Sequence, residues 1–197
     1  MNRAGDRSPI RVQLRAATAA LHDEIEQKLD LTGLSRERYR LLLQAFYGFH
    51  APVEALIASA APVSGFAWPA RAALLERVLL AVGASPSAVA GLPRCTDLPV
   101  LASTGNLAGC LYVLEGACLG GQFIARGLQQ RLGIGPQTGG AFFVGEGAGT
   151  AARWSQVTAW IDGLGRDGAP AAEIVDSASA TFRALLRWSQ DQGAAGA

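Results

Sequence analysis

The 197-residue sequence has few cysteines, almost no net charge and no long uninterrupted apolar run. Cys95, Cys110 and Cys118 are odd in number and lack C-x-x-C spacing, which argues against a disulfide framework or a zinc-ligand pattern. We expect reduced, mostly buried thiols. The formal net charge is +1 and no basic stripe occurs, so a nucleic-acid partner is not expected.

Signals for export or membrane insertion are also missing. The start, MNRAGDRSPIRVQLR, carries charges but no apolar segment of the kind found in secretory signals. The longest apolar stretch, around residues 107–125, is interrupted by Glu115 before it forms the run of about 18 uncharged residues that suggests a membrane helix. These features predict a soluble, cytoplasmic protein with no membrane partner.

What the sequence does contain is helical periodicity. Apolar residues make up 50% of the chain and recur at intervals of three and four residues. No repeat, linker or βαβ alternation is present. We therefore predict an all-α, single-domain helical bundle over residues 11–190, with an N-terminal extension at 1–10 and a flexible C-terminal tail at 191–197.

Six helices are predicted from this periodicity and from residues that start or stop helices. SPSAVAGLPRCTDLP is expected to be a loop or short helix, and AFFV, at 141–144, is the only fragment with strand character. The helices cover residues 11–29, a segment capped by Ser35 that Pro52 kinks or ends and VEALIASA continues, a segment from about Pro69 to Gly83, residues 103–132 ended by Gly133, AARWSQVTAWID capped by Thr150, and PAAEIVDSASATFRALLRW.

His22 lies at the edge of the apolar stripe of the first helix, next to Ile25 on the helix surface. Glu26 follows at i+4, where its carboxylate can accept the Nδ1 proton and orient a histidine whose Nε2 binds a metal. Arg15 lies on the same face, about 10 Å back along the helix axis. The alternative is a half-buried histidine paired with a glutamate for structural reasons, because one histidine specifies no metal.

The other histidine, His50, follows FYGF just before Pro52 and has Glu54 at i+4. It has no carboxylate one turn away on its N-terminal side. We expect a packing or surface role and assign His50 no chemistry.

The helix predicted over residues 103–132 carries glycines in its interior. Tyr112, Gly116 and Gly120 are spaced by four and form one ridge, with Gly121 beside it. Each interior glycine costs about 1 kcal/mol relative to alanine, so main-chain access has to compensate for the loss. A second helix could pack in this trough, or a flat rigid ligand could lie there. Gly121 favours the ligand, because a third glycine exceeds the need of one helix crossing.

Several motifs resemble, in order and spacing, those of the heme oxygenase family. They are ATAALHDEIE, FYGFHAPVEALI, LPVLASTGNLAGCLYVLEG, LYVLEGACLGGQFIARGL and the GIGP…FFVGEG connection. The resemblance covers about residues 12–190 and is strongest to the bacterial biliverdin-producing branch often paired with bacteriophytochromes. It implies oxidative cleavage of heme b by O2 and reductant to biliverdin, CO and iron, with heme as both cofactor and substrate.

The resemblance also implies roles for individual residues. One side of the heme would be held by the histidine and the other would be covered by glycine main chain, while cations and a hydroxyl reach the propionates. The implied heme-binding residues are His22 as the metal ligand, Glu26 as its acceptor, Arg15, Tyr112 and Arg153 at the propionates, and Gly116 and Gly120 as the distal wall. Gly116, Gly120 and Gly121 are the implied catalytic residues.

One position departs from the family pattern. Many members have an aspartate directly after the first distal glycine, where it anchors distal waters, whereas this chain has Ala117 there. The source of distal protons is therefore left open. Cys118, two residues after Gly116, points elsewhere on the helix and is expected to be a buried structural thiol, not a heme ligand.

The resemblance further implies an electron donor such as a ferredoxin or flavodoxin reductase system, and a bacteriophytochrome as a recipient of biliverdin. A basic docking patch for the donor could come from Arg11, Arg15, Arg126 and Arg131. Two alternatives to the oxygenase are a heme-binding or carrier protein with little turnover, and an all-α scaffold whose glycine ridge only packs helices.

Overall fold

In the computed structural model, residues 9–29, 34–60, 71–167 and 169–194 are described. These residues form helices and no strand, which confirms the predicted all-α fold. The helices are α1 (Ile10–Leu29), α2 (Arg36–Ser59), α3 (Arg71–Ala81), α4 (Pro86–Ala90), α5 (Thr104–Leu132), the 3-10 turn η1 (Pro136–Thr138), α6 (Ala141–Val144), α7 (Gly149–Arg166) and α8 (Ala171–Asp191).

Capping residues define the ends of the long helices, and two of them, Ser35 and Gly133, were predicted. The Ser35 side chain accepts from the main-chain N–H of Arg38, and the Ser103 side chain accepts from that of Asn106. Gly133 ends α5 with φ +66°, a left-handed conformation that suits glycine. Pro52 lies inside α2 without ending it. The start predicted at Pro69 lies outside the described residues.

Two local predictions are wrong. AFFV forms the single helical turn α6 instead of a strand. A helical turn lets the consecutive Phe142 and Phe143 both enter the core, at 9% and 4% exposure, whereas a strand would point them to opposite faces. Thr150 does not cap α7, which begins at Gly149. Its hydroxyl instead accepts from the main-chain N–H of Glu146 in the preceding turn.

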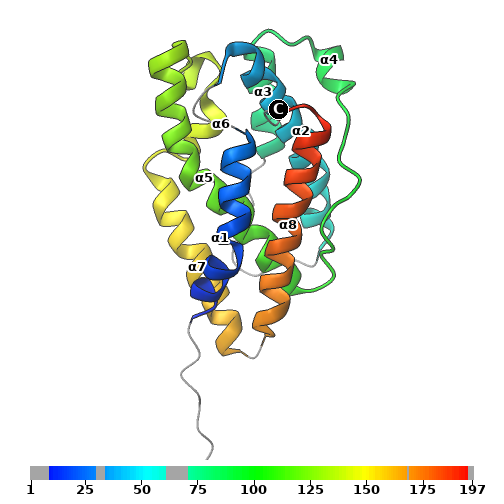
Figure 1. Ribbon diagram of the computed structural model, residues 1–197, viewed down its shortest axis with the longest axis vertical. Helices are drawn as coiled ribbons and strands as arrows, with labels where there is room; N and C mark the ends of the chain where they lie inside the picture. Colours follow the sequence, from blue (N-terminus) through cyan, green and yellow to red (C-terminus); the bar gives the residue numbers. More distant parts are fainter. Residues whose placement is uncertain (1–8, 30–33, 61–70, 168, 195–197) are drawn as a thin grey trace, which may run out of the picture.

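Three helices, α1, α5 and α8, run in the same direction and organise the bundle (Figure 1). α8 packs against both α1 and α5, and α7 also contacts both, while running the opposite way. α1 and α5 thus face each other between α7 and α8. α2 also packs on α8, and it pairs with α3.

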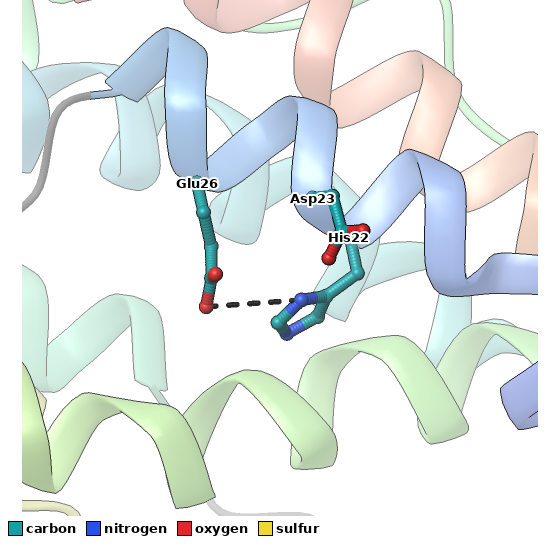
Figure 2. A group of neighbouring side chains, drawn as sticks. All are labelled: His22, Asp23 and Glu26. Atoms are coloured by element: carbon teal, nitrogen blue, oxygen red, sulfur yellow. Dashed lines mark ion pairs between the residues drawn. The ribbon is translucent and has the colours of Figure 1, made fainter.

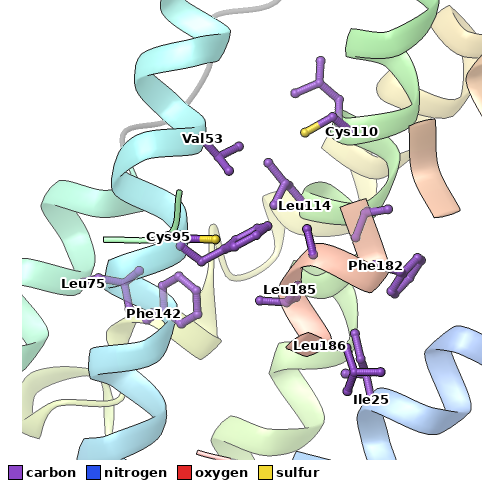
Figure 3. Packing of buried hydrophobic residues seen from close by; sticks show 14 of the residues in the cluster. Ile25, Val53, Leu75, Cys95, Cys110, Leu114, Phe142, Phe182, Leu185 and Leu186 are labelled. Carbon is purple, nitrogen blue, oxygen red and sulfur yellow. The ribbon is translucent and has the colours of Figure 1, made fainter. Parts of the chain in front are cut away.

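The core joins side chains from all of these helices (Figure 3). Ile25 of α1, Val53 of α2 and Leu114 of α5 are each at most 9% exposed and converge with Leu185 and Leu186 of α8. This apolar cluster fixes α1 and α5 to a common support, α8.

Glycines close to the start of α5 allow its tight crossing with α8. A Cβ added at Gly109 would overlap the Ile174 carbonyl oxygen, and one added at Gly105 would overlap the Glu173 carboxylate. Both are explained by packing within the protein. They differ in this respect from Gly120 and Gly127 later in the same helix, where an added Cβ would meet no described atom within 4 Å.

The chain ends of the described region are held by contacts. α1 begins at Ile10, which is 4% exposed. After α8, Ala194 is 3% exposed and its carbonyl accepts from Arg38. The predicted extension and tail otherwise fall largely outside the described residues.

α2 and α5 are each long and apolar enough to cross a membrane by length and composition. Within the bundle, 50% and 56% of these apolar windows are buried, as in the core helices of soluble proteins. The predicted absence of a membrane segment stays a prediction.

Candidate functional site

His22 extends from α1 toward α5 (Figure 2). Its Nδ1 lies 3.7 Å from Glu26 Oε1, and the two side chains are 56% and 62% exposed. The imidazole also meets the ring of Phe182 of α8 edge-on, at 6.2 Å between centroids. The ring therefore lies at the border of the core, with Nδ1 facing its carboxylate partner.

Arg15 of α1 and Tyr112 of α5 lie close together. Burial raises the pKa of the Tyr112 phenol, while a hydrogen bond with Thr18 and the charge of Arg15 lower it. The first helix thus meets α5 at Tyr112. α1 and α5 run in the same direction (Figure 1). His22 follows Thr18 by one helical turn and Gly116 follows Tyr112 by one turn, so both lie one turn beyond the contact between Thr18 and Tyr112.

The glycines of the ridge have different surroundings. A Cβ added at Gly120 would meet no described heavy atom within 4 Å outside its own helical turn. One added at Gly116 would contact the Trp154 ring at 3.4 Å. One added at Gly121 would lie 2.9 Å from the Phe143 carbonyl oxygen in α6.

Packing therefore explains Gly121 and does not explain Gly120. The inference that Gly121 exceeds the need of helix packing is wrong, because α5 crosses α6 at this residue as well as α8 at its start. The predicted role of Gly120 is compatible with its open position, whereas Gly116 is covered on one side by the Trp154 ring.

The α5 face around Gly120 is unusually apolar for an exposed surface. Leu119 and Phe123, one residue before and three after this glycine, are 41% and 64% exposed. Large apolar side chains exposed beside an unfilled glycine position favour a site for an apolar ligand. A macrocycle with a polar edge also suits Arg15 and Tyr112 at one end.

His50 provides an internal comparison. Its Nδ1 also lies 3.7 Å from a carboxylate at i+4, Glu54 Oε1, but its side chain is only 7% exposed. The ring is surrounded by Phe46, Phe49 and Phe142 at 5.5–6.4 Å between centroids. His50 is therefore a core residue, as expected, and the identical pairing shows that exposure, not the i+4 carboxylate, distinguishes His22.

Arg153 lies in a network of charges beside α5. Its Nε donates to Glu115 Oε1 at 2.5 Å and lies 3.6 Å from Glu146 Oε1. The second Glu115 oxygen accepts from Arg71 at 3.2 Å. The guanidinium of Arg153 thus lies within ion-pair distance of two carboxylates. Its contact with a heme propionate stays a prediction.

Cys95, Cys110 and Cys118 are free and buried, as predicted. Burial raises the pKa of Cys110 to about 12, despite a hydrogen bond with Thr181 that lowers it, and burial raises that of Cys118 to about 11. Cys118 donates to the Leu114 carbonyl at 3.3 Å. These thiols stay protonated at neutral pH, which suits structural residues and not thiolate ligands.

The Cys110 thiol predicts a loss of stability in alkali. Below about pH 9, the pKa of an unfolded thiol, both states are protonated and no effect arises. As the pH rises toward 12, the unfolded chain binds fewer protons than the native state, so the free energy of unfolding falls by up to about 1.4 kcal/mol per pH unit. Urea unfolding of wild type and Cys110→Ala at about pH 8 and pH 10 measures this, and the wild type should lose more stability than the variant. Equal losses would contradict the prediction.

Some residues of the site were not predicted from the sequence. Phe182 and Trp154 approach from helices distant in sequence, and no local pattern marks them. Glu115 was visible only as a charge within an apolar segment, and its two arginine partners come from α3 and α7.

Comparison with known proteins identifies a family. The family model described as heme oxygenase matches residues 8–191, nearly the whole chain. Comparison with curated proteins returns no match.

Proposed function

Because the chain belongs to the heme oxygenase family, we propose that it cleaves heme b with O2 and electrons to biliverdin, CO and iron. The family binds heme as both cofactor and substrate, and heme and O2 are the partners that membership implies. The observation that carries the proposal is the exposed His22 of α1, which extends toward α5 (Figure 2), the helix in which Gly120 has an open position.

The described residues fit such a ligand. His22 would hold the iron through Nε2, while Glu26 orients the ring through Nδ1. Arg15 and Tyr112, which lie close together, would bind the propionates. Leu119 and Phe123 would bury apolar surface against the ring.

Bound heme supplies the iron that takes O2 and the meso carbon that is oxidised. The chain contributes a distal side without a bulky or protic side chain. Gly116 and Gly120 would present main chain, and no acid–base group, to a heme held by His22, and would leave little room on that side. An imidazole such as that of His22 would suit heme breakdown as the iron ligand, because a thiolate would favour cleavage of the O–O bond.

The finer assignments belong to the same proposal. The motifs support the bacterial biliverdin-producing branch, with a ferredoxin or flavodoxin reductase system as electron donor and a bacteriophytochrome as recipient of the product. Arg11, Arg126 and Arg131 are exposed and, with Arg15, could form the donor's docking surface. A cytoplasmic location is consistent with the reduced thiols.

Aerobic turnover of the heme complex tests the proposal. With reductant and O2, the Soret band should bleach and one bilin should appear on chromatography, with release of CO and iron. A Soret band that persists through reduction and oxygenation would favour the alternative, a heme-binding or carrier protein. The observation that supports this alternative is Ala117, which stands where many family members have a distal aspartate.

A further inference from the structure

A buried ion-pair network ties the glycine-bearing part of α5 to two neighbouring helices. The Glu115 side chain is 3% exposed, and its two oxygens accept from Arg71 at 3.2 Å and from Arg153 at 2.5 Å. Arg71, 4% exposed, is the first residue of α3, and Arg153 lies near the start of α7. These three residues are called the Glu115 clamp below.

The Glu115 clamp acts on the turn of α5 that carries the first distal glycine. Glu115 directly precedes Gly116 in the sequence. Trp154, which follows Arg153 in α7, places its ring against Gly116. Two consecutive side chains of α7 therefore hold one turn of α5, one by charge and one by packing.

This segment of α5 needs such a restraint. Glycines at 116, 120 and 121 weaken the helix locally, because glycine gains more conformational freedom than alanine when the helix opens. Gly120 also receives no support from a neighbouring residue on its open side. Charged hydrogen bonds in a buried setting are strong and directional, and so can fix the rotation of a turn.

We propose that Glu115 is a positioning residue, which with Arg71 and Arg153 sets how closely the main chain of Gly116 and Gly120 approaches the distal side of bound heme. This inference rests on the function proposed above. Both carboxylate oxygens already accept from guanidinium groups, so we assign Glu115 a positional role and no role in proton transfer.

The test compares the full-length wild type with Glu115→Gln, Arg153→Lys and a control, Ser177→Ala. Ser177 of α8 donates to the Asn106 carbonyl at 2.5 Å, so the control removes a different tether of the same helix while retaining its Cβ. Two quantities are measured. One is amide hydrogen exchange over residues 113–121 and 104–110 of the apo-protein, and the other is the C–O stretching band and CO dissociation rate of the reduced heme complex.

In Glu115→Gln, exchange over 113–121 should accelerate about tenfold while 104–110 is unchanged, because a buried charged hydrogen bond loses its partner. The C–O band should broaden or split, and CO should dissociate about fivefold faster, since the distal wall is no longer fixed. Ser177→Ala should leave the band and the dissociation rate as in wild type.

An unchanged band and dissociation rate in folded Glu115→Gln and Arg153→Lys would overturn the positioning role, even if exchange accelerates. Should Glu115→Gln fail to fold, Arg153→Lys decides by the same criteria, because it keeps the charge at a residue that is 14% exposed. A wild type that binds heme without turnover would instead overturn the proposed function and leave the comparison of C–O bands valid.

Discussion

Replacing His22 by alanine is expected to abolish stable heme binding and to leave the fold of the apo-protein intact. The side chain is 56% exposed, so its removal opens no cavity in the core. Under the proposed function it removes the residue that holds the iron, and loss of even an outer partner of a metal ligand typically costs 10–100-fold in affinity. We expect heme affinity to fall by about 100-fold or more, with loss of the Soret band of the bound state.

His50→Ala is the matched comparison, because both histidines carry a glutamate at i+4 at the same 3.7 Å. His50 is buried among aromatic rings, so its truncation should lower the free energy of unfolding by about 2–4 kcal/mol. The folded fraction should still bind heme with a normal Soret band. Heme titration and urea unfolding of both variants measure these opposite effects. A normal Soret band in His22→Ala would exclude His22 as the ligand.

The two histidines also show how far the sequence could predict the site. Spacing places a carboxylate one turn after each, and the structure confirms both pairs. Which pair is buried depends on α8 and on the α6 aromatics, which arrive from residues more than ninety positions away. Local periodicity contains no information on such neighbours, so the sequence alone left His22 open to a structural interpretation.

α5 illustrates the same division between local and long-range information. Its limits follow from a serine cap and a terminal glycine; the end at Gly133 was predicted, whereas the capping role of Ser103 was not. The purpose of each interior glycine was not predicted either, because it depends on what α8, α6 and α7 place opposite it. Main-chain atoms of other helices lie against Gly109 and Gly121, whereas no described atom lies against Gly120. A glycine count could not separate these cases.

The helical turn α6 was wrongly predicted to have strand character for a related reason. AFFV is apolar at every position, which suits a buried strand or a buried turn equally. The four residues are bounded by Gly140 and Gly145, and no described segment is extended beside them to form a sheet. Helical geometry was therefore the arrangement that buried both phenylalanines.

Gly120→Ala is expected to stabilise the apo-protein and to impair the reaction. The added methyl group meets no described atom, so the gain in helix propensity, about 1 kcal/mol, should appear undiminished in urea unfolding. If Gly120 lies over the heme, the same methyl group enters the space of the bound gas. A displacement of about 1 Å at a reacting centre can cost 100-fold in rate, and we expect bilin formation to fall by about that factor.

Two neighbouring glycines make this prediction specific. Gly127→Ala, also open and two turns further along the same face, should stabilise α5 to a similar extent while bilin formation continues at a rate close to wild type. Gly121→Ala should lower the free energy of unfolding by about 1–3 kcal/mol, because its Cβ would press on the Phe143 carbonyl. Urea unfolding and single-turnover bilin yield, measured on all three, separate helix propensity, packing and catalysis. A Gly120→Ala protein that is more stable and equally active would mean that α5 at Gly120 is not the distal wall, because a methyl group added there would then have no chemical consequence.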